Sequence, residues 1–355
     1  MATEGVPQVV AERWGFAELT LRPLTGGLIN QTFAALRDGE PVAVLQRLHA
    51  IFAPEVNLDI EALTAHLAAR ALTTPRLLRT GDGAAWVVDP QGQVWRALTW
   101  APGRCVARVP DARWAEAGGE LVGRFHRAVA DFAHEYHFRR AGVHDTAAHL
   151  ERLRGWVEHP PPSRAGPADL LPEARALGRD VLATAARLAP LPRTPPRHCH
   201  GDLKISNLLF TEHEPLAGSC LVDLDTIGLG TIAFELGDAM RSWCNPRGED
   251  ERAAAFELPL FAAAVRGFRR RADDLLSDDE RRSIPAGLAT VTVELAARFC
   301  VDVFEDRYFG WDADRFASRR EHNLVRARGQ LSLAHAILTQ LEDATEIACG
   351  AAHGR

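Results

Sequence analysis

The most constraining feature of the chain is the motif HGDLKISN at residues 200–207, together with the two apolar stretches that follow it. The first stretch, LLF at 208–210, comes directly after the motif, and the second, SCLVDLD at 219–225, comes after a polar loop. Two short strands joined by a loop predict a β-hairpin. Folding this hairpin back can bring Asp223 near Asn207, so that a carboxylate and an amide oxygen converge from two chain directions.

The residue types in this hairpin suit phosphate chemistry. A carboxylate from Asp223 and an amide oxygen from Asn207 are hard ligands of the kind that Mg²⁺ prefers, with its remaining ligands taken from water and substrate phosphates. Asp202, five residues before Asn207, is then free to accept a proton. Phosphoryl transfer needs little more than a base that orients a hydroxyl and cations that neutralise charge. A lone Asp or Asn in a loop is usually a turn former, but the combined pattern favours a site.

The rest of the chain divides into two regions of different character. Residues 1–102 are strand-rich, with apolar stretches at 21–36, 41–49, 84–90 and 94–103 and one segment of helical periodicity at 53–70. Residues 103–355 consist mainly of Ala-, Leu- and Arg-rich segments that predict amphipathic helices. A Pro-rich stretch at 158–173 predicts a loop, and GWDADRF at 310–316 interrupts the last helical segments. We therefore expect an α+β architecture with a small mixed sheet lobe and a mainly helical lobe.

Composition excludes several classes of protein. The N-terminal residues lack a basic region followed by an apolar stretch, and nowhere do eighteen apolar residues run together, so we expect a cytoplasmic chain without a membrane span. The 6 cysteines form no CxxC pair, which favours reduced thiols. A net charge of -6 argues against nucleic acid as a partner. Nothing in the sequence indicates the oligomeric state.

HGDLKISN resembles the catalytic loop of the aminoglycoside phosphotransferase and choline kinase superfamily, and LVDLD resembles its metal-binding strand. The resemblance implies that Asp202 is the catalytic base, that Asn207 and Asp223 hold Mg²⁺, and that Lys204 touches the phosphate in transfer. Lys204 is the only lysine among 41 basic residues. A compact ammonium differs from a planar guanidinium in how it meets phosphate, which agrees with a special place for this residue.

Six further segments are similar to N-acetylhexosamine 1-kinase and its relatives. They are GGLINQTF, VLQRLHAIFAPE, VWRALTW, HDTAAHLERL, VDLDTIGLGTIAFELGDAMR and HNLVRARGQLSL. This similarity implies a two-lobed protein-kinase-like fold with ATP bound between the lobes. It also implies a sugar as the acceptor, a hexose or N-acetylhexosamine phosphorylated at its anomeric hydroxyl.

The similarity also implies nucleotide contacts in the first region. Gly26, Gly27 and Asn30 belong to the expected loop over the ATP phosphates, where missing Cβ atoms let backbone N–H groups approach. Kinases of this fold usually carry a Lys on the third strand, but here the nearest cation is Arg47, with Glu55 or Glu61 as possible partners. Alternation places Gln46 and Arg47 on opposite faces of a strand, so a solvent-facing Arg47 is an equal alternative.

Two acids close to the hairpin have several possible roles. Asp225 lies two residues beyond Asp223. Three roles are open for it: a second metal ligand, a substrate contact or a polar strand end. Asp238 resembles the buried acid that braces the catalytic loop in the superfamily.

A charged stripe is expected late in the chain. Its members fall at successive i,i+4 positions of a predicted helix, and they are Glu294, Arg298, Asp302 and Asp306. The stripe is either a solvated face or a wall of the acceptor site, because sugar hydroxyls are well bound by carboxylates and guanidinium groups.

Two alternatives remain open. One is a kinase for another small metabolite such as an aminoglycoside, choline or homoserine, for which the late acidic residues would bind a cationic acceptor. The other is a nucleotide-binding pseudokinase that acts through partners. The presence of Asp202, Asn207 and Asp223 argues against the pseudokinase, whereas the missing strand lysine argues for it.

Overall fold

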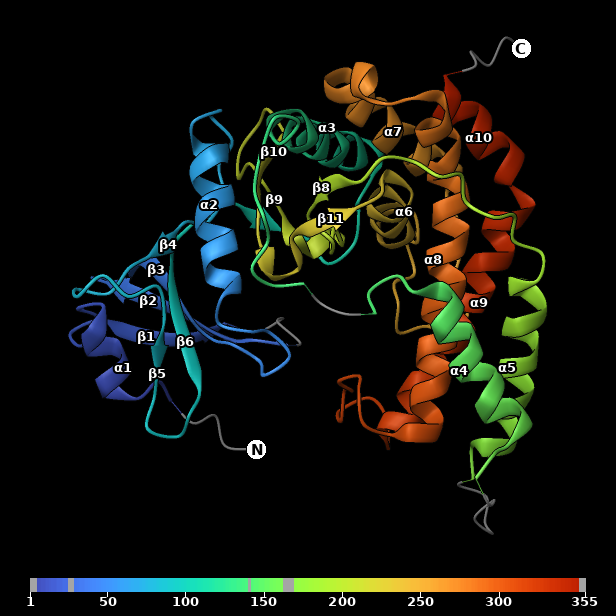
Figure 1. The fold of residues 1–355 in the computed structure, drawn as a ribbon, viewed down its shortest axis with the longest axis horizontal. Helices are drawn as coiled ribbons and strands as arrows, with labels where there is room; N and C mark the ends of the chain where they lie inside the picture. Colours follow the sequence, from blue (N-terminus) through green and yellow to red (C-terminus); the bar gives the residue numbers. More distant parts are fainter. Residues whose placement is uncertain (1–4, 25–28, 140–141, 162–168, 351–355) are drawn as a thin grey trace.

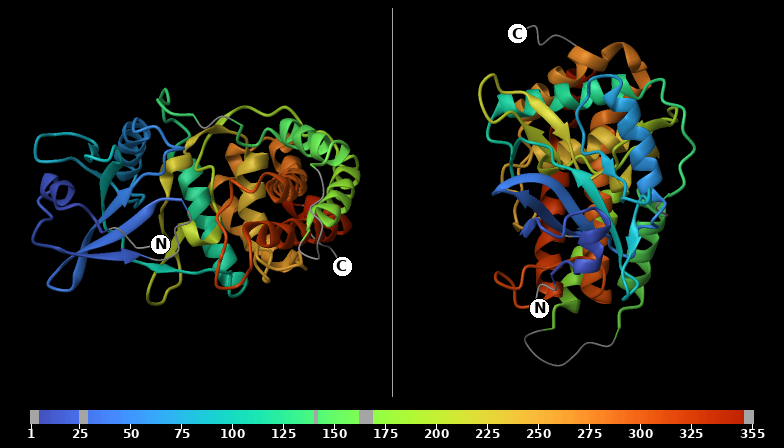
Figure 2. Two further views of the ribbon diagram at one scale, coloured as in Figure 1. Left: turned by 90° about the horizontal axis from the view of Figure 1, so that it is seen from below. Right: turned by 90° about the vertical axis from the view of Figure 1, so that its left-hand side faces the viewer.

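The computed structural model describes residues 5–24, 29–139, 142–161 and 169–350. They form a smaller sheet-containing lobe and a larger helical lobe (Figure 1). Figure 1 and the left view of Figure 2 place the sheet lobe and helices α5 and α9 at opposite ends of the molecule. The mixed α+β architecture expected from the sequence is confirmed.

The smaller lobe contains one antiparallel sheet with the strand order β1-β2-β3-β6-β4, and β5 also pairs with β6. Its elements are α1 (Gln8–Arg13), β1 (Thr20–Leu24), β2 (Gln31–Arg37), β3 (Glu40–Arg47), α2 (Val56–Ala68), β4 (Leu77–Leu78), β5 (Val87–Val88) and β6 (Val94–Thr99). One face of the sheet buries Phe33, Leu45 and Trp95 against α1. Helix α2 lies between the sheet and the larger lobe, where it contacts β4 on one side and α3 on the other.

The chain changes sheets between Thr99 and Arg104, where the lobe boundary is expected. Strand β7 (Arg104–Cys105) pairs with β9 (Leu208–Phe210), which also pairs with β10 (Gly218–Leu221). Strand β8 (Arg197–Cys199) pairs with β11 (Gly228–Gly230). The hairpin predicted from residues 208–210 and 219–225 is the β9–β10 pair, whose second strand ends at Leu221. The chain turns at Gly201, which separates β8 from β9. Gly201 has φ +79°, and a Cβ there would lie 2.5 Å from the carbonyl oxygen of Thr226.

Helices form most of the larger lobe. They are α3 (Ala112–Ala128), α4 (Thr146–Glu158), α5 (Leu171–Ala185), α6 (Ile232–Trp243), α7 (Leu258–Ala272), α8 (Asp278–Glu305), α9 (Arg319–Thr339) and α10 (Leu341–Cys349), with the 3₁₀ turns η1 (Ile205–Asn207), η2 (Leu224–Thr226) and η3 (Asp273–Leu275). Helices α3 and α7 approach closely because Gly119 and Gly267 lie at their contact, where a Cβ on either would meet the backbone of the other helix.

Helix α8 passes through the middle of the helical lobe. It packs against α4, α5, α6 and α9. It is long and apolar enough to cross a membrane, but 83% of its most apolar 18-residue window is buried inside the protein, as in the core helix of a globular fold. Residues 306–318 separate α8 from α9, which confirms the interruption expected around GWDADRF.

Candidate active site

The β9–β10 hairpin brings the predicted chemical residues to one place. Leu221 pairs with Leu208, and the backbone N–H of Val222 donates to the carbonyl oxygen of Asn207 at 2.9 Å. This register sets Asp223 beside Asn207, as the sequence predicts. Asp223 has φ +63°, a left-handed conformation that non-glycine residues rarely adopt.

Asp202, Lys204 and Asn207 converge on one another within the loop before the hairpin. The Oδ2 atom of Asp202 accepts hydrogen bonds from Nζ of Lys204 at 3.0 Å and from Nδ2 of Asn207 at 3.1 Å. The same Asn207 nitrogen donates to the carbonyl oxygen of Asp202 at 2.8 Å. Because the amide nitrogen faces Asp202, the amide oxygen of Asn207 is the atom available to a cation.

Burial and the neighbouring charges together shift the pKa values of Asp223 and Lys204. Burial, with the charges of Asp225 and Asp202, raises the pKa of Asp223 to about 6, although Lys204 opposes the shift. Burial alone would lower the pKa of Lys204, but the carboxylates of Asp202 and Asp223 outweigh it and raise that pKa. An excess of negative charge at Asp223 is the condition in which a bound cation is stabilised. The oxygen ligands of Asn207 and Asp223 thus fit Mg²⁺.

Glu235 on α6 supports the backbone of the catalytic loop. Its carboxylate accepts the backbone N–H groups of His200 at 2.7 Å and of Gly201 at 2.9 Å. The Nε2 atom of His200 lies 2.9 Å from the carbonyl oxygen of Val222, so it carries the proton, and Nδ1 accepts the backbone N–H of Asp202. The sequence interpretation gave the bracing role to Asp238 instead. That prediction is wrong, because Asp238 pairs with Arg241 at 2.9 Å.

A second correction concerns Arg47, the cation expected in place of the usual strand lysine. Arg47 shares a sheet face with Leu45, on the α1 side, and its charge acts on Asp89, which accepts the indole N–H of Trp95. It therefore lies on the face of the sheet that is turned away from the larger lobe. Of its suggested partners, Glu61 pairs with Arg79. Arg96 of β6 is a buried cation on the face toward the larger lobe, where it pairs with Asp225.

The carboxylate of Asp225 is occupied by protein donors and is closed to a metal or a substrate. Its side chain is 1% exposed and accepts hydrogen bonds from Arg96 and from Asn30. The strand does not continue as far as Asp225, because the chain enters η2 at Leu224. Of the residues expected in the phosphate loop, Asn30 belongs to the part of the chain that the structure describes, whereas Gly26 and Gly27 lie outside the described residues.

A pocket of about 630 Å³ lies beside the expected acceptor residues. Ile51 of the smaller lobe and Phe138, Val301 and Phe309 of the larger lobe supply apolar surface, and Arg298 lines it. The guanidinium of Arg298 lies over the rings of Tyr308 and Phe309 and 3.7 Å from Glu294.

Glu294 is buried behind this pocket. It accepts a hydrogen bond from Thr146 at 2.6 Å and lies 3.5 Å from Nδ1 of His144. Burial would raise the pKa of Glu294, but His144, Thr146 and Arg298 together lower it. Glu294 thus remains ionised and orients Arg298 and His144, a residue that the sequence interpretation overlooked.

Two other members of the charged stripe are structural. Asp302 accepts the backbone N–H groups of Arg307, Tyr308 and Phe309 and the side-chain amide of Asn323. Its carboxylate is therefore occupied by the loop after α8, although Asp302 also lines the pocket, and its contact with a substrate stays a prediction. Asp306 ends α8 and pairs with Arg320 at 3.2 Å.

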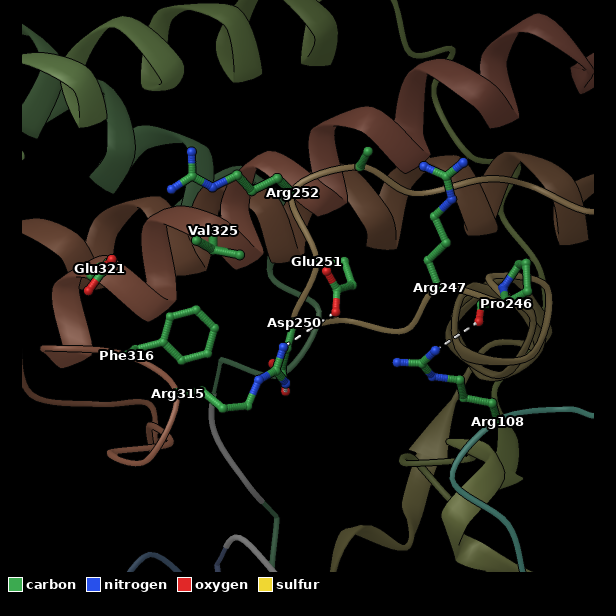
Figure 3. Close-up of a pocket in the computed structure, with 11 residues that line it drawn as sticks. Arg108, Pro246, Arg247, Asp250, Glu251, Arg252, Arg315, Phe316, Glu321 and Val325 are labelled. Carbon is green, nitrogen blue, oxygen red and sulfur yellow. Dashed lines mark hydrogen bonds and ion pairs between the residues drawn. The ribbon is translucent and has the colours of Figure 1, made fainter.

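A second pocket, of about 600 Å³, opens between the loop after α6 and the start of α9. Arginine and acidic side chains surround it, and Arg315 lies toward Glu251 across it (Figure 3). Asp250 on its wall accepts hydrogen bonds from His322 and Arg326. Asp250 thus pairs with Arg326, which is 5% exposed.

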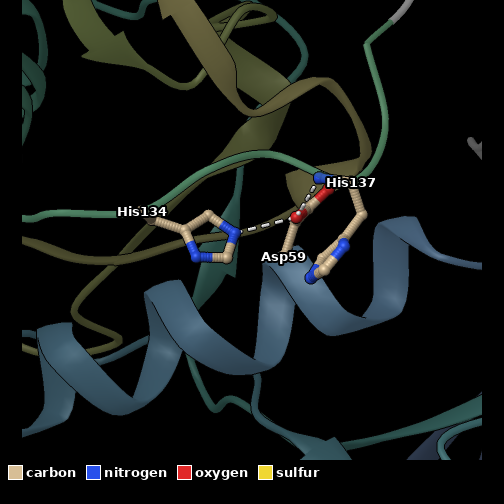
Figure 4. A group of neighbouring side chains, drawn as sticks. All are labelled: Asp59, His134 and His137. Atoms are coloured by element: carbon tan, nitrogen blue, oxygen red, sulfur yellow. Dashed lines mark hydrogen bonds and ion pairs between the residues drawn. The ribbon is translucent and has the colours of Figure 1, made fainter.

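Asp59, His134 and His137 form a cluster with ligand-type atoms within 4.8 Å of one another (Figure 4). Asp59 of α2 accepts hydrogen bonds from the His134 ring at 2.8 Å and from the backbone N–H groups of His137 and Phe138. The carboxylate is thus already satisfied by protein donors. The cluster ties α2 to the segment that follows α3.

Comparisons with known proteins agree with this geometry. The family model "Phosphotransferase enzyme family" matches residues 20–273. The chain belongs to this family. A homoserine kinase of Acidiphilium cryptum is 28% identical over 211 residues, which cover 58% of each protein. A homoserine kinase of Cupriavidus pinatubonensis is 27% identical over 226 residues, 58% of this chain and 59% of the relative. The chain thus matches less than two thirds of either relative's length.

Solved structures show the same fold. A microcompartment-associated aminopropanol kinase has a TM-score of 0.65 at 16% identity and covers 96% of this chain and 98% of its own. The amicoumacin kinase hAmiN, in complex with AMP-PNP, Ca²⁺ and Ami, has a TM-score of 0.58 at 15% identity and covers 94% and 91%. The two-lobed kinase-like fold predicted from the sequence is confirmed. A special closeness to N-acetylhexosamine 1-kinase is absent from these findings and stays a prediction.

Proposed function

We propose that this family member transfers the γ-phosphoryl group of ATP to a hydroxyl of a small acceptor, with Mg²⁺ as the metal. The observation that carries the proposal is the convergence of Asp202, Lys204, Asn207 and Asp223 around the start and end of the β9–β10 hairpin. A base, a cation and two oxygen ligands at one point are the groups that phosphoryl transfer requires. We further propose that the reaction takes place in the cytoplasm.

Each residue has a defined part in the proposed reaction. Hydrogen bonds from Lys204 and Asn207 fix Oδ2 of Asp202, so Oδ1 is the atom that orients the acceptor hydroxyl and receives its proton. The ammonium of Lys204 offsets negative charge on the transferring group. Asn207 and Asp223 would hold the metal, which when bound neutralises phosphate charge and fixes phosphate geometry.

The first candidate acceptor is a hexose or N-acetylhexosamine, phosphorylated at its anomeric hydroxyl. Its support is the resemblance of six sequence segments to N-acetylhexosamine 1-kinases. A pocket of about 630 Å³ with a guanidinium on its wall has room and hydrogen-bonding capacity for a hexose. None of the relatives and solved structures reported above is named as a sugar kinase. The support for a sugar acceptor is therefore the resemblance of the sequence segments.

The second candidate is a small hydroxylated acid, because the curated relatives are named homoserine kinases. The charges of the pocket favour it. Arginines outnumber acids on the wall, and these charged residues are Arg139, Arg152, Arg298, Arg307, Asp302 and Glu305. Asp302 is occupied by backbone N–H groups and Glu305 by Arg152. Such a wall suits a carboxylate better than the cations of choline or an aminoglycoside.

A panel assay tests the proposal. ADP release from Mg-ATP is measured against free hexoses, N-acetylhexosamines, homoserine, amino alcohols, choline and aminoglycosides, with Asp202→Asn as the blank. We expect turnover with one acceptor class, lowered at least about 100-fold in the variant. Undiminished turnover in the variant contradicts the role of Asp202. Nucleotide binding without turnover on any acceptor favours the pseudokinase alternative.

A further inference from the structure

Arg96 and Asp225 form a buried ion pair between the two lobes. Arg96 lies on β6 of the smaller lobe, Asp225 lies in η2 of the larger lobe, and each side chain is 1% exposed. Nη1 of Arg96 donates to Oδ1 of Asp225, and Nη2 donates to Oδ2 at 2.9 Å. Nε and Nη2 of the same guanidinium donate to Oε1 of Gln46 on β3 at 2.9 and 2.7 Å. A two-pronged pair of this kind fixes direction as well as distance.

Asn30 connects the same carboxylate to the start of β2. Its Nδ2 atom donates to Oδ2 of Asp225 at 2.5 Å, and its Oδ1 accepts the backbone N–H of His49 at 2.9 Å. Asn30 is 9% exposed and is the described residue for which a nucleotide contact is expected from the sequence. A single carboxylate thus holds the sheet through Arg96 and the entry of β2 through Asn30.

Asp225 is also two residues from Asp223, the candidate metal ligand. The backbone of Asp223 has a left-handed conformation that is rare for a non-glycine residue. The direction of its side chain therefore depends on the contacts that hold the chain on either side. On one side the β9–β10 hairpin holds it, through the hydrogen bond from Val222 to Asn207. On the other side the anchor is the interlobe contact of Asp225.

We propose that Arg96 and Asp225 are positioning residues that align Asn30 and the sheet of the smaller lobe with the candidate metal ligand Asp223 of the larger lobe. This inference rests on the proposed function and deepens it. The two charges neutralise each other inside the protein, so Arg96 acts through Asp225 rather than as a free cation for phosphate. A buried ion pair is a poor source of stability but a good source of specific geometry. Its benefit is therefore expected in nucleotide binding.

The test compares binding of Mg-AMP-PNP, measured by calorimetry, in the wild type, Asp225→Asn, Arg96→Lys and the double variant Arg96→Met/Asp225→Leu. We expect the single variants to weaken binding by about tenfold or more, within the range of coupling between sites. The double variant replaces the ion pair with apolar groups and is expected to keep the melting temperature near that of the wild type. It should nevertheless bind Mg-AMP-PNP weakly.

A matched control is Glu280→Gln, which breaks the buried pair of Arg197 and Glu280 within the larger lobe. We expect it to lower the melting temperature and to leave Mg-AMP-PNP affinity unchanged. Wild-type affinity in the double variant would overturn the positioning role, and so would equal losses in the double variant and the control. A wild-type protein that does not bind Mg-AMP-PNP would overturn the proposed function itself, which separates the two failures.

Discussion

The ammonium of Lys204 lies 3.0 Å from the Oδ2 atom of Asp202, so the candidate base carries a cation as its direct partner. The same Nζ atom is 3.9 Å from Oδ2 of Asp223. Both carboxylates oppose the effect of burial and raise the pKa of Lys204. The lysine therefore stays charged at neutral pH, between the proposed base and the proposed metal ligand.

Replacing Lys204 with Met should lower kcat by about 100-fold, because the transition state loses a preorganised charge. Lys204→Arg should recover only part of this loss, because a planar fork cannot contact both carboxylates and a phosphate as a compact ammonium does. Steady-state kinetics with a saturating acceptor measure the effect. Arg187→Met, at an exposed position after α5, is the control. Equal activity of Lys204→Met and the control would contradict the role.

The convergence of the candidate catalytic residues could be predicted because their geometry is local. Asp202, Lys204 and Asn207 lie within one loop, and a tight β9–β10 hairpin adds Asp223 through a register that apolar patterning reveals. The mixed architecture follows in the same way from the change between strand-like and helical periodicity near residue 100.

The errors at Arg47 and Asp225 concern partners that are far apart in sequence. Arg96 is separated from Asp225 by 129 residues, and no local pattern shows that they meet. Alternation correctly separated Gln46 from Arg47, but it could not say which face of β3 meets the cleft. Asp302 has helical spacing typical of a stripe, and only the path of the loop after α8 shows that its carboxylate is used as a cap.

Replacing Glu235 with Gln should destabilise the protein by about 3 kcal/mol at pH 7, because it removes a charge from a buried, hydrogen-bonded group. Burial raises the pKa of Glu235, but His126 and the backbone of His200 outweigh it, and the net shift is downward from 4.5. The stability that comes from this lowered pKa is present above pH 4.5. It is lost as the pH falls through the lower pKa of the folded state.

Thermal unfolding of both proteins from pH 7 to pH 3 measures this effect. The wild type should lose more stability below pH 4.5 than Glu235→Gln, so the difference between them should shrink on acidification. A constant difference across this range would show that the charge of Glu235 does not stabilise the loop. Asp343→Asn, at an exposed position on α10, is the control that should change nothing.

Arg298→Ala should raise the KM for the acceptor about tenfold and leave the KM for ATP unchanged, since its guanidinium lines the pocket. Asp302→Asn should act differently, because its carboxylate holds the loop after α8. We expect it to lower the melting temperature, with a smaller effect on the acceptor KM than that of Arg298→Ala. The reverse order of the two acceptor KM values would mean that Asp302, rather than Arg298, contacts the acceptor.

Removing the carboxylate of Asp223 should weaken the binding of Mg²⁺. Asp223→Asn is expected to raise the Mg²⁺ concentration for half-maximal activity at least about tenfold, since even partners of ligands alter metal affinity by about this factor. Titration of MgCl₂ at fixed ATP measures the change, and a chelator should abolish activity of the wild type. Asn207→Asp keeps an oxygen ligand and should shift the Mg²⁺ requirement less than Asp223→Asn. An unchanged Mg²⁺ requirement in Asp223→Asn would place the metal ligand elsewhere in the cleft.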